Sequence, residues 1–305
     1  MPVRSAFQPP FQLKADDRAA TFGSSFARNI SPMLRAAGFD FLLTETPAPT
    51  TTTSFDHSHN SGIYSACYGD IKTPRQIMQL FKRAYQKFVP DDDFWIIDGS
   101  YIDPFRPHIK PCGFLSSAAY QSEREQHFAA VRNAFERATV FIIEFETISG
   151  WCAITDNAMI PIAPEYVGNF SEQHKYHEIE MRLTDIRDDL EDFIADLRGI
   201  NPGCKIIFLV SPLPAPESPF DRREYFKSVL VIALTEISRV HQNISYFPFY
   251  DIIQNQYVAN ESYLSADQTS INAMGWRCVM DCFFQSFTRA APPLLPVSFS
   301  DDISP

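Results

Sequence analysis

The sequence predicts an α/β protein, a three-layer α/β/α sandwich with a mostly parallel sheet at its centre. Short apolar runs at 140–145 and 205–210 have the composition of buried strands. Longer stretches with apolar residues at helical spacing separate these runs, as expected for parallel strands joined by crossover helices. At 305 residues the chain is long enough to bury a large core as one domain.

The expected elements begin with a strand that ends at Gly23 and a helix that follows it to Gly38. Pro32 either kinks this helix or restarts it. Thr73 and Pro74 have the residue types of a helix cap and a first helical position. Further helices are expected at 73–88, 117–137, 171–199, 222–241 and 271–287, and further strands at 140–145, 205–210 and 244–249.

Residues 20–288 are expected to form a single domain, because the chain shows no internal repeat and no clear linker. Within this domain we expect an irregular insertion at about 44–115, which opens with a long polar loop. It includes a stretch at 89–114 that is rich in proline and aromatic residues and is expected to lack regular structure. Residues 1–19 are expected to form an extended N-terminal segment, and 289–305 a loose C-terminal tail.

Charge and composition argue against several classes of function. The net charge of −11 disfavours a broad nucleic-acid-binding surface, which needs a basic face. No apolar run reaches the roughly 18 residues of a membrane span, and the N-terminus lacks the apolar segment of a secretory leader. The six cysteines show no paired C-x-x-C spacing, so we expect reduced thiols, a cytoplasmic location, and neither a metal nor a cofactor. The sequence leaves the oligomeric state open.

The segment of most functional interest is 21–30, with the sequence Thr-Phe-Gly-Ser-Ser-Phe-Ala-Arg-Asn-Ile. An apolar run meets Gly23, two serines follow, and a helical pattern begins, which is the layout of a nucleophilic serine on a strand-to-helix turn. The free N–H groups at the start of the helix then face the group that the serine attacks. Alternatively, Ser24 only caps the helix, since serine is a favoured cap residue.

Polar residues directly follow three of the expected strands. Ser25 follows the first strand, the Glu146-Thr147 pair follows the strand at 140–145, and Ser211 follows the strand at 205–210. In parallel α/β sheets, sites form at the carboxyl ends of the strands. This coincidence favours the functional interpretation of the turn at Gly23.

Seven segments form a pattern that extends from about residue 20 to residue 287. They are Gly23-Ser24-Ser25-Phe26-Ala27, Asn60-Ser61-Gly62-Ile63-Tyr64-Ser65, Thr73-Pro74-Arg75-Gln76, Asp103-Pro104-Phe105-Arg106-Pro107, Val210-Ser211-Pro212-Leu213-Pro214, Phe226-Lys227-Ser228-Val229-Leu230 and Tyr246-Phe247-Pro248-Phe249-Tyr250-Asp251. In this order they resemble the motifs of the GSCFA family, whose first motif usually has cysteine where this chain has Ser25. Seven matches in the same order are hard to produce by chance.

This resemblance implies a fold and a set of site residues. The GSCFA family is placed among SGNH-type (GDSL-like) hydrolases and acyltransferases, which have a flavodoxin-like three-layer fold. By the resemblance, Ser25 is the nucleophile of a turn that also includes Gly23 and Ser24. The oxyanion is then held by the Ser25 N–H and by Gly62 or its neighbours, with the Asn60 side chain as a candidate donor.

The chain departs from the SGNH pattern near its C-terminus. The SGNH block is D-x-x-H, in which an aspartate orients the histidine that activates the serine. The matching residues here are Asp267-Gln268-Thr269-Ser270, and no histidine lies beyond His241. The family's G-L-T-E-x-W segment also differs, because Glu146 and Thr147 stand in swapped order and two residues are added before Trp151. The identity of the base is therefore open.

Four residues are candidates for the missing base: His57 and His59 in the polar loop, Glu146, and Asp267. Glu146 qualifies if its carboxyl is desolvated enough to raise its pKa. The structural alternatives are solvated loop positions for His57 and His59, and an ion pair with Arg75 or Arg106 for Glu146. The same two arginines are candidates for bidentate binding of an anionic substrate group, with structural salt bridges as the alternative.

Aromatic residues offer a possible wall for a sugar ring, with core packing as the alternative for each. They are Trp151, Tyr64, Tyr68 and Tyr101.

Together these patterns lead us to expect an SGNH-like esterase or O-acyltransferase, with Ser25 as nucleophile. Its substrate is a small molecule or an acylated carbohydrate, in bacterial polysaccharide biosynthesis in the cytoplasm. The absent histidine leaves a second hypothesis open, a catalytically silent SGNH-fold module that binds a glycan or a protein. A third is a site rebuilt for another reaction, such as glycosyl or sulfuryl transfer, with the Glu144-x-Glu146 pair at its centre.

Overall fold

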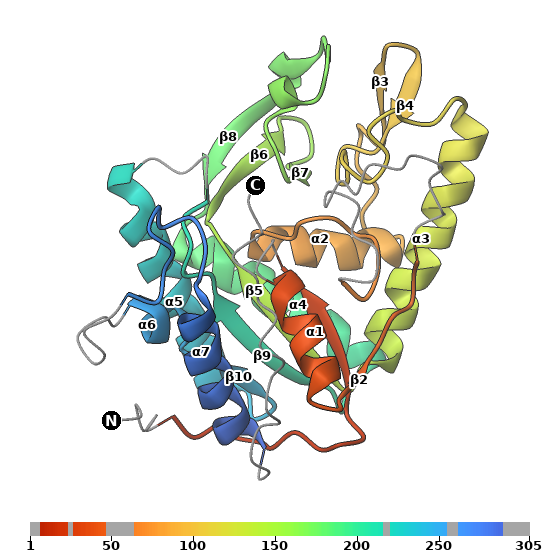
Figure 1. The fold of residues 1–305 in the computed structure, drawn as a ribbon. Helices are drawn as coiled ribbons and strands as arrows, with labels where there is room; N and C mark the ends of the chain where they lie inside the picture. Colours follow the sequence, from red (N-terminus) through yellow and green to blue (C-terminus); the bar gives the residue numbers. More distant parts are fainter. Residues whose placement is uncertain (1–6, 24–26, 47–63, 216–219, 255–261, 289–305) are drawn as a thin grey trace.

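A parallel sheet of five strands forms the centre of the molecule. The structure is a computed structural model that describes residues 7–23, 27–46, 64–215, 220–254 and 262–288. The strands of the central sheet are β1 (Arg18–Phe22), β2 (Asp40–Phe41), β5 (Val140–Phe145), β9 (Lys205–Val210) and β10 (Ile244–Tyr246). Their order in the sheet is β2-β1-β5-β9-β10, and every neighbouring pair is parallel (Figure 1).

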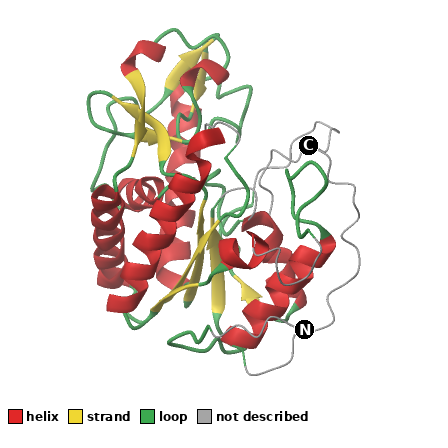
Figure 2. Ribbon diagram, turned by 90° about the vertical axis from the view of Figure 1, so that its left-hand side faces the viewer, coloured by secondary structure: helices red, strands yellow, loops and turns green. Residues whose placement is uncertain are grey.

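Two layers of helices cover the two faces of this sheet (Figure 2). One face packs against α2 (Pro74–Ala84), α3 (Ser117–Arg137), α4 (Leu183–Ile200) and α5 (Arg223–Val240). The other packs against α1 (Ala27–Ala36), α6 (Phe249–Gln254) and α7 (Ala273–Phe287). The prediction of a three-layer α/β/α sandwich is confirmed, and the strand order is that of flavodoxin-like folds. Within the described part of the chain, no helix combines the length and the apolar character that crossing a membrane requires.

Alternation of side chains along β5 explains why the sheet has a core on each side. Phe141 and Ile143 pack in the cluster that contains α2–α5, whereas Val140 and Ile142 pack in the cluster that contains α1, α6 and α7. Because both faces are covered, the strand is apolar at nearly every position. Glu144 is the exception, a fully buried carboxyl on the face that α1 covers.

Local sequence signals set the start of α2. The Thr73 hydroxyl accepts a hydrogen bond from the Gln76 backbone N–H, and the Gln76 side chain accepts one from the Thr73 N–H. This reciprocal cap satisfies two N–H groups that the first turn of a helix leaves free. Pro74 occupies the first helical position, as the sequence predicted. In α1, Pro32 lies inside the helix, which continues through it.

Two small antiparallel sheets lie toward one end of the central sheet (Figure 1). One is the hairpin of β3 (Trp95–Ile97) and β4 (Ser100–Ile102), and the other has the order β7 (Met159–Ile160), β6 (Ser149–Ala153) and β8 (Tyr176–Glu180). Apolar side chains of both sheets share a third core cluster. Three short 3-10 helices complete the described structure: η1 (Pro164–Tyr166), η2 (Gln173–Lys175) and η3 (Phe220–Arg222).

The expectation of no regular structure at 89–114 is wrong, because this stretch contains the β3–β4 hairpin. Asp98 and Gly99 connect its strands with φ values of +50° and +79°. Positive φ at both central residues is the turn geometry that closes two-residue hairpins, and Asp-Gly is a favoured pair for it.

The long helix expected at 171–199 is also wrong in its first part. Residues 173–180 form η2 and β8, and α4 begins only at Leu183. Ile179 lies at helical spacing from Leu183 and Ile186, which led to the expected helix, but it pairs instead with Gly150 of β6. A tertiary partner that is distant in sequence therefore decided the structure of this stretch.

Asp17 connects three strands at the amino end of the central sheet. Its carboxylate accepts hydrogen bonds from the Lys14 N–H (2.8 Å), the Thr139 hydroxyl (2.8 Å) and the Lys205 ammonium (2.7 Å). Thr139 directly precedes β5, and Lys205 is the first residue of β9. Burial by itself raises the pKa of Asp17, but these hydrogen bonds hold it below its ordinary value of 3.8.

We expect Asp17→Asn to lower the free energy of unfolding by about 2 kcal/mol at neutral pH, a common magnitude for hydrogen bonds to a charged group. Because the pKa of Asp17 is depressed by folding, its contribution is present above 3.8 and is lost as the pH falls below that value. Urea unfolding of both proteins at neutral pH and at the lowest pH where they stay folded measures this difference. Asp16→Asn, at an exposed neighbouring position, is the control. A deficit in Asp17→Asn that is independent of pH would contradict the assignment.

Candidate active site

The Glu144 carboxyl lies against the turn between β1 and α1. Its Oε2 accepts a hydrogen bond of 2.9 Å from the Ala27 N–H at the start of α1. On the other side of the turn, a Cβ placed on Gly23 would lie 3.0 Å from the same oxygen and 2.9 Å from the Glu144 Cβ. Gly23 thus has no room for a side chain, and its φ of +155° also favours glycine. Glu144 therefore contacts both ends of the turn.

Glu144 is completely buried, and its pKa is far from the ordinary value of 4.5. Burial raises the pKa to about 8, with a further contribution from the negative charge of Glu146. Hydrogen bonds from Ser211 and from the Ala27 N–H, together with the positive charge of Lys227, act in the opposite direction. The carboxyl is therefore mostly protonated at pH 7 and can gain or lose a proton close to physiological pH.

Lys227 of α5 connects the loops that follow two neighbouring strands. Its ammonium donates to the Glu146 carbonyl after β5 (2.6 Å) and to the Leu213 carbonyl after β9 (2.7 Å). The side chain is buried, which lowers the pKa of Lys227 to about 8, although the charges of Glu146 and Glu144 act to raise it. By holding the two loops together, Lys227 fixes the backbone that carries the pair of carboxyl groups.

The segment at 71–72 ties the Gly23 turn to the loop after β5. The Ile71 N–H donates to the Gly23 carbonyl (2.9 Å). The next residue, Lys72, accepts at its carbonyl from the N–H groups of Glu146 (2.9 Å) and Thr147 (3.3 Å). These main-chain hydrogen bonds fix the turn and the loop relative to each other.

Several residues of the sequence-based site lie outside the described residues. They are Ser24, Ser25, His57, His59, Asn60 and Gly62. Among the others, the structure brings Gly23, Glu146 and Ser211 together around Glu144. The candidate active site of the described chain is therefore this group of residues, at the carboxyl ends of β1, β5 and β9.

Arg75 and Arg106 both form ion pairs with acidic side chains. The Arg75 Nε lies 3.0 Å from Asp189 of α4. Arg106 is buried and contacts Asp103 and Glu123, each at 2.8 Å. The structure thus shows for both arginines the structural alternative that the sequence had left open.

The side chains of Asp267 and Thr147 form hydrogen bonds with residues close to them in the chain. Asp267 lies on an exposed loop before α7 and accepts from the Ser265 hydroxyl (2.6 Å) and the Thr269 N–H (3.1 Å). The Thr147 hydroxyl accepts from the Ser149 N–H (3.1 Å). In the part of the chain that the structure describes, neither side chain hydrogen-bonds Glu144.

Of the aromatic residues considered for a sugar wall, Tyr64 and Tyr68 are buried in the core. The Tyr68 hydroxyl donates to the Thr21 carbonyl of β1, and the Tyr64 hydroxyl donates to Asp70 (3.2 Å). Trp151 is only half-buried. The core interpretation therefore applies to the two tyrosines, whereas Trp151 can be reached from solvent.

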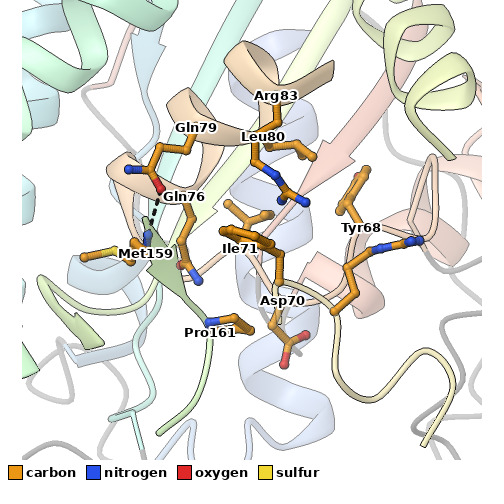
Figure 3. A pocket seen from close by; sticks show the side chains of 11 residues that line it. Tyr68, Asp70, Ile71, Gln76, Gln79, Leu80, Arg83, Met159 and Pro161 are labelled. Atoms are coloured by element: carbon orange, nitrogen blue, oxygen red, sulfur yellow. Dashed lines mark hydrogen bonds between the residues drawn. The ribbon is translucent and has the colours of Figure 1, made fainter. Parts of the chain in front are cut away.

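A small cavity of about 20 Å³ lies below α2 (Figure 3). The buried Arg83 guanidinium lies beside it and stacks on Phe105, 3.4 Å from the ring centroid. Gln79 accepts a hydrogen bond from the Met159 N–H at its edge (Figure 3). A cavity of this size holds about one water molecule, so it is too small for a substrate.

A larger pocket of about 290 Å³, which we call the Trp151 pocket, adjoins it between the three-stranded sheet and the start of α2. Its volume is at the lower end of the range for small-molecule sites. Its walls include Lys72, Gln76, Trp151, Ile160, Glu165 and Glu178.

The leading hypothesis from the sequence gave no role to Glu144 or to Lys227. Glu144 entered only as part of the rebuilt transferase hypothesis, and Lys227 only as part of a motif. A signal for Glu144 was available, since it is the only charged residue in the apolar run at 140–145. Lys227 lies between apolar positions of α5 that are buried, which is an unusual place for a lysine.

No group of three or more His, Cys, Asp or Glu side chains that could hold a metal ion occurs among the described residues. All six cysteines are free.

The family model of GSCFA matches residues 18–283, most of the chain. The chain belongs to the GSCFA family. The family resemblance seen in its seven sequence motifs is thereby confirmed. A comparison of this GSCFA chain with curated proteins finds no match.

Solved structures that match this GSCFA chain do so at low sequence identity. A family 3 carbohydrate esterase of Clostridium thermocellum is 9% identical, with a TM-score of 0.39, over 88% of this chain and 94% of that chain. A family 2 carbohydrate esterase with a carbohydrate-binding domain from Corynascus thermopiles (Myceliophthora fergusii) is 13% identical, with a TM-score of 0.36, over 93% of this chain and 68% of that chain. An acetyl xylan esterase from the rumen bacterium Butyrivibrio proteoclasticus is 11% identical, with a TM-score of 0.27, over 76% of this chain and 54% of that chain.

We expect the stability of this GSCFA protein to depend on pH through Glu144. Its pKa is raised to about 8 on folding, so between about pH 4.5 and 8 the folded chain keeps a proton that the unfolded chain releases. Stability from this group therefore falls as the pH rises through that range. Glu144→Gln removes the titration and keeps an oxygen that can accept from Ala27. Thermal unfolding from pH 5 to 8 should show a midpoint that declines more steeply for the wild type than for the variant; parallel curves would contradict the raised pKa.

Proposed function

We propose that this protein breaks or transfers an acyl ester, with Ser25 as the nucleophile and Glu144 as the group that accepts its proton. The observation that carries the proposal is the place of the Glu144 carboxyl between Gly23 and Ala27, the residues that flank the motif Ser24-Ser25-Phe26. A nucleophilic serine needs a base nearby. Here a carboxyl with a pKa of about 8 lies against Gly23 and Ala27, in a chain that has Ser270 in place of the SGNH histidine.

The proposed reaction has two stages. The Ser25 Oγ attacks the acyl carbon while its proton passes to the ionised Glu144 carboxylate, and the bond from the acyl carbon to the alcohol oxygen breaks. Glu144 returns that proton to the leaving alcohol. Water, or a hydroxyl of a second substrate, then attacks the acyl-enzyme, gives its proton to Glu144, and Ser25 takes it back. Water as acceptor gives an esterase, and a sugar hydroxyl gives an O-acyltransferase.

The surrounding residues support these steps. Ser211 hydrogen-bonds Glu144, and the negative charge of Glu146 holds the pKa of Glu144 up, which makes its carboxylate a stronger base. Lys227 is a positioning residue, since its contacts are to the backbone of the two loops. The developing oxyanion is assigned to the N–H of Ser25 and to Gly62 or Asn60, the donors that the family resemblance implies.

The substrate that we propose is an acylated carbohydrate, in cytoplasmic polysaccharide biosynthesis. One support is the SGNH-type chemistry that the family resemblance implies. The other is the Trp151 pocket, whose walls contain an aromatic ring and carboxylates and which lies beside the proposed nucleophile turn.

A second function has one observation in its favour. Asp267, the match to the aspartate of the D-x-x-H block, forms hydrogen bonds within its own loop, and Ser270 replaces the histidine. This arrangement would suit a catalytically silent module that binds a glycan or a protein partner.

Removal of the proposed nucleophile separates the two functions. We expect Ser25→Ala to lose at least about 1000-fold in kcat for p-nitrophenyl acetate and to lose labelling by a fluorophosphonate probe. Ser228→Ala, which removes an exposed hydroxyl on α5, is the control and should behave as the wild type. Equal labelling of wild type and Ser25→Ala, with no turnover of any aryl acetate, would support the silent module.

The role of Glu144 has its own test. Glu144→Gln keeps an oxygen for the Ala27 N–H but cannot take a proton, so we expect kcat to fall about 100-fold or more. In the wild type, kcat/KM should rise with pH up to about 8, the pKa of Glu144, and this rise should be absent in the variant. A variant with lower activity but an unchanged pH profile would show that Glu144 only positions the turn.

A further inference from the structure

The Trp151 pocket has the chemistry of a carbohydrate subsite. We propose that it binds one uncharged sugar ring, so that an acyl group on this ring reaches the Gly23 turn. The inference rests on the proposed function for the acyl chemistry, but the binding of the ring itself does not depend on it.

Strand pairing forms one wall of the pocket. Trp151 of β6 lies directly opposite Ile160 of β7 on one side and Glu178 of β8 on the other. Residues directly opposite each other in antiparallel strands point to the same face of the sheet, so these three side chains form a row. An indole ring beside a carboxylate offers an apolar surface for the C–H face of a sugar and an acceptor for its hydroxyls.

Gln76 supplies a donor from the opposite wall. Its Oε1 accepts from the backbone N–H groups of Lys72 (2.8 Å) and Thr73 (2.9 Å). Because both partners are donors, the oxygen must face them, and the orientation of the amide is fixed. The Gln76 Nε2 has no hydrogen-bond partner among the described residues, although only 7% of the residue is exposed. The Nε2 is not among the fully buried unpaired atoms of the described chain, so water can reach it, and a ligand oxygen can take the place of that water.

The direction of the Gln76 side chain agrees with this role. Figure 3 shows it extending from α2 toward Pro161, which lines both the small cavity and the Trp151 pocket. The small cavity has space for about one water molecule only. The Trp151 pocket is therefore the space in which a ligand larger than water can meet this amide.

Charge and size restrict the ligand. The pocket has one cationic side chain, Lys72, and two carboxylates, Glu165 and Glu178. This balance disfavours phosphate or nucleotide groups, which attract clusters of basic residues. A volume of about 290 Å³ suits one ring with its substituents better than a long chain. An uncharged polyol ring fits both restrictions.

The pocket lies next to the candidate active site. Lys72 forms part of its wall, and the preceding residue, Ile71, donates its N–H to the Gly23 carbonyl. Adjacent Cα atoms are about 3.8 Å apart, so the wall and the turn are separated by only a few ångströms of chain. An ester on a ring bound in the pocket therefore needs no long linker to reach the turn.

The test uses the exposure of Trp151. Of the three tryptophans, Trp95 and Trp276 are buried, so acrylamide should quench mainly the fluorescence of Trp151. We expect methyl glycosides of xylose, glucose and N-acetylglucosamine to include at least one that protects this fluorescence. Glu178→Gln, at an exposed position that leaves the core intact, should weaken that protection at least about threefold, while Tyr225→Ala on α5 should not change it.

The catalytic readout compares two esters that differ in the sugar. For the monoacetate of the protecting glycoside, Trp151→Ala should lower kcat/KM at least about tenfold, because the face of the ring loses its contact. For p-nitrophenyl acetate, which has no sugar ring, the loss should be smaller, so the ratio of the two kcat/KM values should fall at least about fivefold in the variant. An equal loss for both esters would show a structural effect of the substitution and overturn the inference.

Failure of the inference and failure of the proposed function give different results. If the wild type hydrolyses neither ester but a glycoside still protects Trp151, the subsite stands and the esterase proposal fails. If p-nitrophenyl acetate and the monoacetates of the three methyl glycosides are hydrolysed while no glycoside protects Trp151, and Trp151→Ala acts as the wild type, the subsite alone is overturned.

Discussion

The site depends on a carboxyl group buried inside the central sheet. Burial of an ionised carboxylate is strongly unfavourable, so Glu144 must be neutral or paired in the folded chain. The fold meets this demand with three groups: the Ala27 N–H at a helix start, Ser211 after β9, and Lys227 from α5. The absence of a side chain at Gly23 leaves room for the carboxyl. The buried position of Glu144 thus explains why a glycine stands at position 23, what the Ala27 N–H donates to, and why the pKa of this carboxyl is raised.

Sequence predicted those parts of the fold whose signal is local. The strands at 140–145 and 205–210 and the helix at 117–137 have the bounds that the apolar patterns gave. The small sheets were missed, because β8 is stabilised by pairing with β6, more than 20 residues away in the chain. Its sequence, Tyr-His-Glu-Ile-Glu, alternates too weakly to be told from the start of a helix.

For the candidate site, too, the sequence indicated the segments that are continuous in the chain but not the contacts between distant residues. Motif resemblance located the turn at Gly23 and the loop at Glu146, since both are continuous in sequence. The partners of charged residues were not predictable in this way. Arg75 pairs with Asp189, and Lys227 binds the carbonyl of Glu146, across separations of 114 and 81 residues. Only packing of α2 on α4, and of α5 on the sheet, brings these groups together.

The stretch from Glu144 to Trp151 joins the two halves of the proposed chemistry. At one end is the carboxyl that takes the proton, and at the other is the ring that would hold the sugar. Main-chain hydrogen bonds from Glu146 and Thr147 to the Lys72 carbonyl fix the middle of this stretch against the segment that also binds Gly23. The residues from Glu146 to Trp151 therefore set the path of the chain from the turn to the pocket.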